Sequence, residues 1–521
     1  MTTLRDIFEQ SVKNNSDKEA LVDVRLSKRW TFSQWNKEVN QLARAFTRAG
    51  VKKGDRVSTV LFNTSEFAMT LLACIKLGAV FNPINFRLTD KEIEFIINDA
   101  EPRIVLFEKA VENQIRPLAD LFPNVEFWYI DEDPPSYAYS YYERLSIEDT
   151  TRPEVSLTEE DIYAIMYTSG TTGKPKGVVH KHRDMVDQSV LIIASQRISA
   201  KDNGLSVAPL FHCAELHCAF IPRFHLGVKN VLLHHFEPEA VLNTVQKENI
   251  SIFFAAPTMW SMLIQEKKES MELTSLKKAL YGGAPMAPAL VKEVHNTFNV
   301  QLFQAYGMTE MGPAITILSD DEQLSKAGSA GKPLINHEIR VVRTRNDGKL
   351  DPDDEAKAGE QGEIIVRGPS MMSEYYKRPE ATAEVLYNGW YYSGDVGYFD
   401  EDGYLWVNDR IKDMIVSGGE NIYSREVEDA LFDHPGVLDA AVVGEPDEKW
   451  GERVMAFIVK KEESLTAEEL ERFCINSDRI ANYKRPRRYE FVEELPRNAS
   501  GKLQKFKLRE KVMKQEGSSK V

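Results

Sequence analysis

The segment YTSGTTGKPKG, at residues 167–177, carries the strongest signal in the sequence. Its eleven residues include three glycines, four threonine or serine residues and two lysines. Backbone amides of glycine-rich chain, hydroxyl groups and ammonium groups are the donors that a polyphosphate requires. Lys174 is followed by Pro175 rather than by serine or threonine, so the segment is not the usual P-loop and a helix interior is excluded there. We predict a phosphate-binding loop between strands at 162–167 and 177–179, with a flexible surface hairpin as the alternative.

The loop lies within a long region in which helical and strand patterns alternate. Apolar residues recur at helical spacing in some segments and form short continuous runs in others. Helices are expected at residues 36–50, 67–77 and 89–98, and strands at 56–61, 79–82 and 103–107. The same rhythm recurs from Gly204 to about Thr316. Alternating strands and helices predict a mostly parallel sheet covered by helices.

The pattern changes after Gly328. Short strands separated by Asp/Gly turns, as in RNDGKL and DEDGYL, predict an antiparallel sheet or barrel. A smaller unit follows Asp409, with helices expected at 424–434 and 466–474 and strands at 440–443 and 454–459. We therefore predict a main boundary near residue 410, which divides the chain into domains 1–410 and 411–521.

The composition is that of an ordinary globular chain. Of its 521 residues, 42% are hydrophobic and 28% charged, and the formal net charge of −15 argues against a nucleic-acid partner. Four scattered cysteines are too few for a disulfide framework and are typical of a reducing cytosol. The first residues lack the apolar stretch of a signal peptide, and polar residues interrupt the most apolar segment, 67–80. We expect a cytoplasmic enzyme without an integral membrane segment.

Six further segments accompany the loop in a fixed order. They are APLFH (208–212), YGGAP (281–285), QAYGMTE (304–310), GWYYSGDVG (389–397), DRIKDMIVSGGENI (409–422) and PRNASGK (496–502). With the loop, they resemble the signature of the adenylate-forming superfamily, which comprises acyl- and aryl-CoA synthetases, peptide-synthetase adenylation domains and luciferases. The resemblance implies an α/β fold, in which a large N-terminal AMP-binding domain of two α/β subdomains and a small β-barrel precedes a smaller, mobile α+β C-terminal domain.

The resemblance also implies where ATP binds, and the residue types suit that role. Gly282, Gly283 and Ala284 are small enough for a flat purine to approach the backbone, and Tyr306 can stack on it. A tight turn and a core tyrosine are the alternatives for these features taken alone. By the resemblance, the ATP- and AMP-binding residues are Thr168, Ser169, Gly170, Thr171, Thr172, Gly173, Lys174, Lys176, Gly283, Ala284, Pro285, Gln304, Ala305, Tyr306, Gly307, Thr309, Asp395, Arg410 and Lys502.

Three of the predicted site residues are expected to act in catalysis. Activation of a carboxylate with ATP requires Mg²⁺ on the phosphates and a cation beside the developing negative charge. By the resemblance, Thr168 and Glu310 are the residues linked to Mg²⁺. Lys502 would bridge the attacking carboxylate, the α-phosphate and the leaving pyrophosphate through its ammonium group. Taken alone, such a glutamate or tail lysine would more often be a solvated surface charge.

Asp395 and Arg410 are expected to form a ribose clamp. The Asp402-Gly403 pair marks a hairpin turn, and a loop at 400–403 would place Asp395 opposite Asn408. Arg410 would then be the diagonal neighbour of Asp395 on the same face, roughly 7–8 Å away. A carboxylate beside a guanidinium can accept hydrogen bonds from a ribose diol, the role that the resemblance assigns to it. A plain cross-strand salt bridge is the alternative.

The segment after Arg410 is expected to contain a hinge and part of the thiol channel. By the resemblance, Lys412 is the position about which the C-terminal domain turns between two half-reactions. The CoA channel would be lined by Ser417, Gly418, Gly419 and Glu420. Many relatives have proline at the position of Ser424, so we expect this serine to loosen the loop. A basic-aromatic cluster at 483–489 would serve solubility or attract the phosphates of CoA.

The acid is expected to bind beside the segment HCAELHC, at residues 212–218. On a helix its potential ligands would face different ways, and no second cluster completes a set of four, so structural zinc is disfavoured. By the resemblance, the acyl pocket is formed by His212, Leu216, Gly283 and Gly307. Peptide-synthetase adenylation domains usually have aspartate where this chain has His212, which argues against an amino-acid substrate.

The resemblance therefore implies an ATP-dependent acid–CoA ligase that uses ATP, Mg²⁺ and coenzyme A, the last as a substrate. A fatty acid is the first choice, because apolar residues near the site offer a lining, although they could equally be ordinary core residues. These residues are Phe211, Leu216, Phe220, Phe254, Met259 and Trp260.

Several alternatives stay open. The acid could be aryl, of the cinnamate type, or short and polar, and the protein could be a stand-alone adenylation enzyme that loads a carrier protein. A light-emitting or oxygenase relative and a binding protein without turnover are weaker alternatives. The oligomeric state is left open, with a homodimer as one option.

Overall fold

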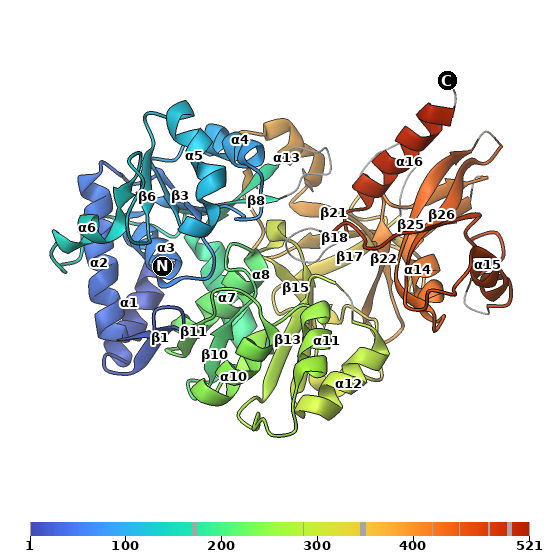
Figure 1. Cartoon of the computed structure of the whole chain (residues 1–521), viewed down its shortest axis with the longest axis horizontal. Helices are drawn as coiled ribbons and strands as arrows, with labels where there is room; N and C mark the ends of the chain where they lie inside the picture. Colours follow the sequence, from blue (N-terminus) through green and yellow to red (C-terminus); the bar gives the residue numbers. More distant parts are fainter. Residues whose placement is uncertain are drawn as a thin grey trace. The chain divides into compact units, whose positions relative to one another are not determined.

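The computed structural model describes residues 2–168, 175–284, 286–343, 351–418, 420–447, 449–477, 480–497 and 503–519. The chain divides into two compact units (Figure 1). The first unit comprises Met1–Glu338 and Arg367–Leu386, and the second comprises Ile339–Val366 and Tyr387–Val521. The domain boundary expected between residues 410 and 411 stays a prediction.

An eight-stranded sheet in the first unit carries the predicted phosphate loop. Its strand order is β19-β9-β8-β4-β3-β5-β6-β7. The strands are β3 (Arg56–Val60), β4 (Val80–Pro83), β5 (Ile104–Phe107), β6 (Glu126–Tyr129), β7 (Tyr139–Ser140), β8 (Ile162–Thr168), β9 (Lys176–Lys181) and β19 (Glu374–Tyr375). The strands from β8 to β7 pair in parallel, whereas β8 with β9 and β9 with β19 are antiparallel. The strands predicted on both sides of the loop are thereby confirmed.

A nine-stranded sheet forms the other half of this unit, in the order β16-β15-β14-β13-β12-β10-β11-β1-β2. Its strands are β1 (Glu19–Asp23), β2 (Lys28–Thr31), β10 (Asn203–Ser206), β11 (Lys229–Leu232), β12 (Ile252–Phe254), β13 (Lys278–Gly282), β14 (Gln301–Gly307), β15 (Ala314–Leu318) and β16 (Lys332–Pro333). Side chains alternate between its two faces, as a strand requires. Phe253 packs into one core cluster, whereas Ile252 and Phe254 on the same strand pack into another.

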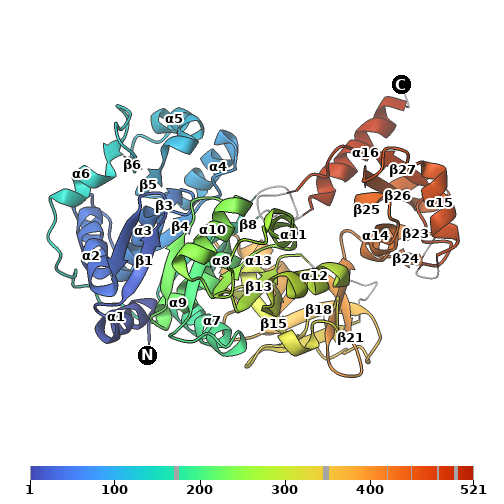
Figure 2. The ribbon, with the colours of Figure 1, turned by 60° about the horizontal axis from the view of Figure 1, so that its bottom comes forward.

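Helices cover both sheets of the first unit. They are α1 (Leu4–Asn14), α2 (Phe32–Arg48), α3 (Ser65–Leu77), α4 (Asp90–Ala100), α5 (Glu112–Leu121), α6 (Tyr141–Ser146), α7 (His182–Ser195), α8 (Cys213–Glu215), α9 (Ile221–His225), α10 (Pro238–Glu248), α11 (Pro257–Glu266), α12 (Pro288–Phe298) and α13 (Pro379–Val385). Short 3₁₀ turns lie at Lys109–Val111, Thr309–Met311 and Asp320–Glu322, and a π-helical turn lies at Leu216–Phe220. Helices α10, α11 and α12 follow one another beside the nine-stranded sheet (Figure 2), where they share a core cluster with β12 and β13.

Helix α3 joins the two sheets of this unit. Every one of its residues is buried, and its core cluster contains Leu21 from β1 and Val57 from β3. The hydroxyl of Thr64 caps its first turn, and Gly78 ends it with a positive φ of 67°. The predicted helices at 36–50, 67–77 and 89–98 are confirmed, although α2 begins earlier, at Phe32, because Thr31 forms a capping box with Gln34.

The second unit begins with an antiparallel sheet, as the Asp/Gly turns predicted. Its order is β17-β18-β21-β20, and β22 also pairs with β21. The strands are β17 (Glu338–Val342), β18 (Gly362–Arg367), β20 (Leu386–Tyr387), β21 (Trp390–Phe399) and β22 (Leu405–Arg410). This sheet carries the predicted ribose clamp at the end of β22.

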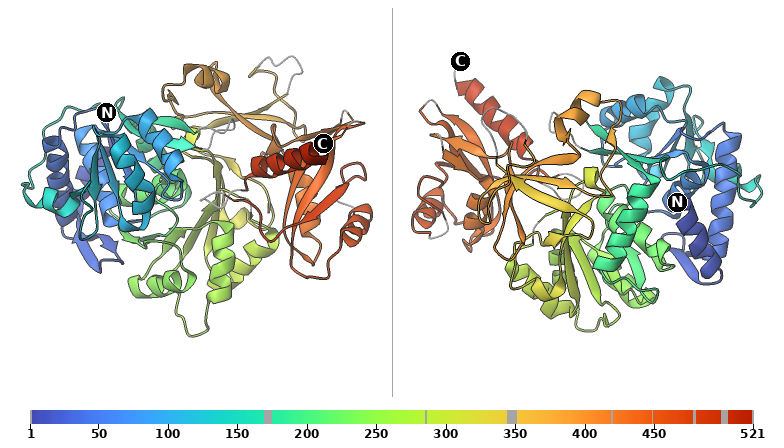
Figure 3. Two further views of the ribbon diagram at one scale, coloured as in Figure 1. Left: turned by 45° about the horizontal axis from the view of Figure 1, so that its top comes forward. Right: turned by 180° about the vertical axis from the view of Figure 1, so that it is seen from behind.

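A second sheet in this unit packs helices on both faces. Its elements are β23 (Ile415–Ser417), β24 (Glu420–Ile422), α14 (Ser424–Phe432), β25 (Val437–Asp447), β26 (Gly451–Lys460), α15 (Ala467–Ile475), β27 (Arg488–Phe491) and α16 (Lys505–Ser519). Ala440 and Val442 on β25 face a core cluster with α14 and α15, whereas Ala441 and Val443 face a cluster with α16. Figure 3 shows helix α16, in red, lying across this sheet. With the two α/β sheets and the antiparallel sheet, this α+β part confirms the predicted fold class.

Two further observations concern the described part of the chain. No helix in the described part of the chain is long and apolar enough to cross a membrane. The four cysteines, all of which the structure describes, are free and buried.

Candidate functional site

The predicted phosphate loop connects β8 to β9, which pair as an antiparallel hairpin. Thr168 on β8 pairs with Lys176 on β9 at the last position of the ladder. The base is tightly packed, because a Cβ atom on Gly177 would lie 2.6 Å from Ile165 Cγ2. Nine predicted site residues lie outside the described residues, namely Ser169, Gly170, Thr171, Thr172, Gly173, Lys174, Pro285, Gly419 and Lys502. Thr168 and Lys176, which the structure describes, are the predicted site residues on the two sides of this segment.

The predicted purine site lies where β13 and β14 end side by side. These strands are parallel, with Gly282 opposite Ala305, and a Cβ atom on Gly282 would lie 2.6 Å from the Ala305 carbonyl. Gly283, in contrast, has a positive φ of 78° and nothing within 4 Å of an added Cβ atom. Open space beside Gly283 is what a flat base needs, and Ala284 follows it directly. Tyr306 lies one residue beyond Ala305 on β14.

The structure explains why β14 has glutamine at position 304 and glycine at position 307. Gln304 is buried, and its Oε1 accepts a hydrogen bond from the Tyr281 hydroxyl at 3.2 Å. A Cβ atom on Gly307 would lie 1.7 Å from the Pro313 carbonyl oxygen, so only glycine fits there. Close backbone packing thus accounts for Gly307, whose role in an acyl pocket stays a prediction.

The turn that carries Thr309 and Glu310 is held by buried polar side chains. His180 on β9 donates from Nε2 to the Thr309 carbonyl at 2.7 Å, and the thiol of Cys213 lies 3.2 Å from the Thr309 hydroxyl. His217 donates from Nδ1 to the Gly312 carbonyl at 3.1 Å, and its Nε2 accepts from the Tyr163 hydroxyl. Burial lowers the pKa of His217 well below its usual value, so the ring stays neutral and keeps this tautomer.

Two residues of the segment HCAELHC, Cys213 and His217, provide this support. Its backbone runs through α8 into the π-helical turn, so the α-helical spacing assumed for its side chains does not hold. Among the described residues, no group of three or more His, Cys, Asp or Glu side chains could hold a metal ion.

Glu215 is completely buried 3.6 Å from Arg223, and burial raises its pKa to about 7.

The predicted acyl lining is largely packed into the core. His212 caps α8, with Nδ1 accepting from the Ala214 amide at 3.2 Å. Leu216, Phe220 and Trp260 are each 0% exposed within hydrophobic clusters. These three side chains therefore have the packing of ordinary core residues, the alternative that the sequence left open. Phe211 is only partly buried.

Glu310 and Lys176, predicted to act on the same phosphates, both contact Tyr375. The Tyr375 hydroxyl donates to Glu310 Oε1 at 2.8 Å, and the Lys176 ammonium lies 4.9 Å from the centre of the ring. Tyr375 belongs to β19, which pairs with β9, and is only 5% exposed. The sequence pattern did not predict Tyr375 as a site residue, because no spacing rule links residues so far apart in the chain. Carboxylate and hydroxyl oxygens are the hard donors that Mg²⁺ prefers, so Glu310 and Thr168 suit this ion.

The two residues of the predicted ribose clamp, Asp395 and Arg410, pair in a different register from the one expected. Asp395 lies directly opposite Arg410, not opposite Asn408, and Arg410 Nε donates to Asp395 Oδ1 at 3.0 Å. The loop spans 400–404, one residue more than expected, and an irregularity after Val396 skips Asn408. The longer loop and the irregularity each shift the pairing by one residue, so Asp395 pairs with Arg410, two residues beyond Asn408. Asp395 and Arg410 therefore still share one face of the sheet, and they lie closer together than the diagonal neighbours that we predicted.

Glu363 is a second carboxylate beside this clamp. Its Oε1 accepts from the Gly394 amide at 3.1 Å, and the Gly394 carbonyl accepts from the Ile411 amide at 2.9 Å. Burial raises the pKa of Glu363 to about 7, and the negative charge of Asp395 adds to the shift. Gly394 thus connects β18 to the backbone next to the predicted hinge residue Lys412.

Ser424 tightens the segment after Lys412, contrary to the expectation that it loosens the loop. Its amide and its hydroxyl donate to Asp409 Oδ2 at 2.5 and 2.6 Å. Proline has no N–H or hydroxyl, so it could make neither bond. A second contact joins Asp413 to Arg509 of α16 at 2.6 Å. The residues on both sides of Lys412 are therefore bonded to the helices that follow.

The structure describes part of the predicted CoA channel and the basic-aromatic cluster at 483–489. Gly418 has a positive φ of 61°, and a Cβ atom there would lie 2.7 Å from the Trp450 ring. In the basic cluster, Lys484 pairs with Glu426 at 2.7 Å, and Arg488 pairs with Glu445 at 2.5 Å. These ion pairs reduce the positive charge available to the phosphates of CoA.

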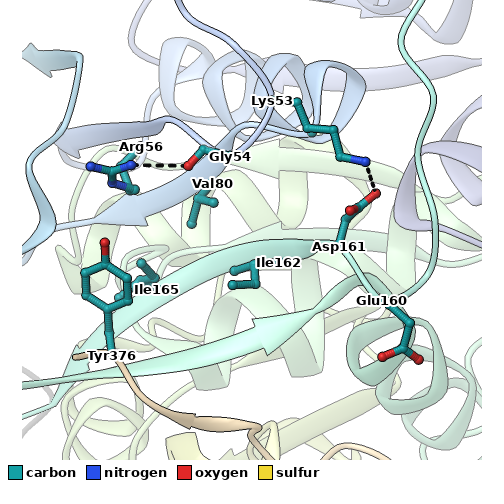
Figure 4. Close-up of a pocket in the computed structure, with 10 residues that line it drawn as sticks. Lys53, Gly54, Arg56, Val80, Glu160, Asp161, Ile162, Ile165 and Tyr376 are labelled. Carbon is teal, nitrogen blue, oxygen red and sulfur yellow. Dashed lines mark hydrogen bonds and ion pairs between the residues drawn. The ribbon is translucent and has the colours of Figure 1, made fainter. Parts of the chain in front are cut away.

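A pocket of about 350 Å³ lies elsewhere in the first unit (Figure 4). Lys53 pairs with Asp161 at 2.7 Å, and Arg56 donates to the Gly54 carbonyl at 3.3 Å. Its apolar lining includes Val80, Ile162 and Ile165. None of the predicted ATP-binding residues that the structure describes lines this pocket, and Lys53 and Arg56 already have protein partners. We therefore do not assign the reaction to it.

Known proteins resemble this chain over nearly its whole length. The family model described as AMP-binding enzyme matches residues 8–376, and the one described as AMP-binding enzyme C-terminal domain matches residues 426–502. The long-chain-fatty-acid–CoA ligase FadD13 of Mycobacterium tuberculosis is 35% identical over 496 residues, which cover 94% of this chain and 95% of that protein. Feruloyl-CoA synthase of an Amycolatopsis species is 36% identical over 485 residues, which cover 92% and 93%. The crystal structure of the anthranilate CoA ligase AuaEII in complex with anthranoyl-AMP has a TM-score of 0.88 at 28% identity and covers 98% of this chain and 97% of that one.

Proposed function

The chain belongs to the AMP-binding enzyme family, and from this premise we propose that it is an ATP-dependent acid–CoA ligase. In the first half-reaction an oxygen of the acid attacks the α-phosphorus of ATP, and the bond to pyrophosphate breaks to leave an acyl-AMP. In the second, the thiol of CoA loses its proton and attacks the acyl carbonyl, which releases AMP. Positioning and charge stabilisation, rather than a covalent enzyme intermediate, account for catalysis.

The observation that carries this proposal is the convergence of Lys176 and Glu310 on Tyr375. Lys176 ends the phosphate loop, and its ammonium lies 4.9 Å from the ring that donates to Glu310 at 2.8 Å. Lys176, a cation beside the proposed phosphate-binding loop, and Glu310, a carboxylate for Mg²⁺, thus contact the same side chain. Thr168 and Glu310 would hold the ion, which would neutralise part of the phosphate charge when bound.

The remaining roles follow the predicted site. Gly283, Ala284 and Tyr306 would hold the purine, and Asp395 with Arg410 would hold the ribose hydroxyls. Lys502 would stabilise the charge that develops in the first half-reaction. The C-terminal part after Lys412 would turn between the two half-reactions, which need different groups over one site. We also place the enzyme in the cytoplasm, where four unpaired cysteines are expected.

The acid is proposed to be a fatty acid, with an aryl acid as the second candidate. Identities of 35% to the fatty-acid ligase and 36% to the feruloyl ligase support both choices about equally. His212 at the predicted pocket argues against an amino acid. A short polar acid stays a further alternative.

The test measures acid-dependent pyrophosphate release with CoA across aliphatic, aryl and short polar acids, and identifies the thioester by mass. We expect one class to be turned over with equal amounts of AMP and acyl-CoA. Turnover of a pantetheinylated carrier protein but not of CoA would favour the stand-alone adenylation enzyme. Absence of pyrophosphate release with every acid would overturn the proposal.

A further inference from the structure

Tyr375 lies in a strap, residues 370–376, that is bonded on two sides. On one side, the Tyr376 amide donates to the Gly177 carbonyl at 2.7 Å, at the base of the phosphate loop. On the other side, the Met372 amide donates to the Glu310 carbonyl at 2.7 Å, and the Ser370 hydroxyl donates to the Met311 carbonyl at 2.6 Å. The strap therefore fixes the distance between the loop base and the turn that carries Glu310.

The side chain of Tyr375 continues this connection. Its hydroxyl holds Oε1 of Glu310 at 2.8 Å, and a hydrogen bond to a carboxylate is among the stronger ones in proteins. No partner of Glu310 Oε2 is found among the described residues, so this second oxygen is left for another ligand. A carboxylate held by one oxygen can rotate little, because turning it would break the bond.

The ring of Tyr375 acts on Lys176 in a similar way. The ammonium lies 4.9 Å from the ring centre, within the range of a cation–π contact. Within the described part of the chain, Lys176 has no carboxylate partner. The contact thus orients the lysine without neutralising it, which keeps its charge available to a phosphate.

We infer that Tyr375 is a positioning residue for adenylation: its hydroxyl aims Glu310 at the Mg²⁺ of Mg·ATP, and its ring aims Lys176 at the phosphates. The inference rests on the proposed function. The two roles of Tyr375 can be tested separately, because its hydroxyl contacts Glu310 whereas its ring contacts Lys176.

The test uses Tyr375→Phe, which removes only the hydroxyl, and Tyr375→Leu, which also removes the ring. The matched control is Tyr376→Phe, because the neighbouring tyrosine bonds to Gly177 through its backbone amide. Binding of ATP is measured calorimetrically at increasing Mg²⁺ without acid, so that no turnover occurs. Acid-dependent pyrophosphate release is then measured over the same Mg²⁺ range.

Tyr375→Phe should raise the half-saturating Mg²⁺ concentration about tenfold in both measurements, with kcat at saturating Mg²⁺ within about threefold of the wild-type value. Tyr375→Leu should also weaken ATP binding at saturating Mg²⁺, and Tyr376→Phe should change neither quantity. In a Glu310→Gln background, Tyr375→Phe should have no further effect on the Mg²⁺ dependence, because its partner is already changed.

Failure of this inference and failure of the proposed function give different results. An active wild-type enzyme whose Mg²⁺ dependence is the same in Tyr375→Phe overturns this inference alone. An equal effect of Tyr375→Phe with and without Glu310 also overturns it, because the hydroxyl would then act elsewhere or only on folding. A wild-type protein without acid-dependent pyrophosphate release overturns the proposed function and this inference with it.

Discussion

Replacing Asp395 with asparagine tests the proposed ribose clamp. The carboxylate is 5% exposed and accepts from Arg410 at 3.0 Å on one face of β21 and β22. Hydrogen bonds to a charged acceptor contribute about 1.5–3 kcal/mol each. Asparagine keeps the shape and one oxygen but loses the charge, so we expect a loss of about 2 kcal/mol, or roughly 30-fold in the Kd for ATP.

A pair of nucleotides makes the test specific. The wild-type protein should bind ATP at least about tenfold more tightly than 2′-deoxy-ATP, because the deoxy sugar lacks one hydroxyl donor. In Asp395→Asn the two nucleotides should bind alike, whereas Asp402→Asn at the exposed hairpin turn should preserve the difference. Binding is measured calorimetrically without acid. If Asp395→Asn still discriminated between the nucleotides like the wild type, the carboxylate would not contact the 2′-hydroxyl and the clamp would be refuted.

Three further predictions concern the hinge, a buried carboxyl and the bonds to Asp409. Lys412→Pro should impair thioester formation from supplied acyl-AMP more than adenylation, because proline fixes the φ angle that the rotation changes; equal losses would contradict this. Burial raises the pKa of Glu215 from its ordinary value of 4.5 to about 7 in the folded protein, so the folded state binds this proton more tightly than the unfolded chain. The stability that the bound proton provides is therefore lost as the pH rises from 4.5 towards 7. The free energy of unfolding relative to Glu215→Gln should therefore fall by about 3 kcal/mol over that window in denaturant titrations, and a constant difference would show that the pKa of Glu215 is not raised. Ser424→Pro should accelerate tryptic cleavage beside Lys412 about tenfold by removing both donors to Asp409, and unchanged cleavage would show that these bonds do not restrain the hinge.

The strands around the phosphate loop could be predicted because their signal is local. The runs at 162–167 and 177–179 lie beside a Gly-rich, Pro-containing segment, and β8 and β9 occupy them. The register of Asp395 and Arg410 could not be predicted in detail. A bulge and a longer loop each shift the pairing by one residue, and neither leaves a clear mark in the sequence.

The residues that support the site were missed for a different reason. His180 bonds to a carbonyl 129 positions away, His217 to one 95 positions away and Tyr375 to a carboxylate 65 positions away. Such contacts depend on how two sheets pack, which spacing along one element does not specify. Leu216 is an apolar residue next to a motif, and its side chain packs into the core. The sequence alone does not distinguish such a residue from one that lines an open pocket.

In the proposed reaction the carboxylate of the acid attacks the α-phosphorus of ATP. The most direct measurement incubates the ¹⁸O-carboxylate-labelled form of the best acid with ATP, Mg²⁺ and CoA, and follows the label by mass spectrometry. If an acyl-AMP forms and CoA displaces AMP, one ¹⁸O atom appears in AMP and none in pyrophosphate. Label in inorganic phosphate, together with ADP as the nucleotide product, would show attack at the γ-phosphorus and contradict the proposed mechanism.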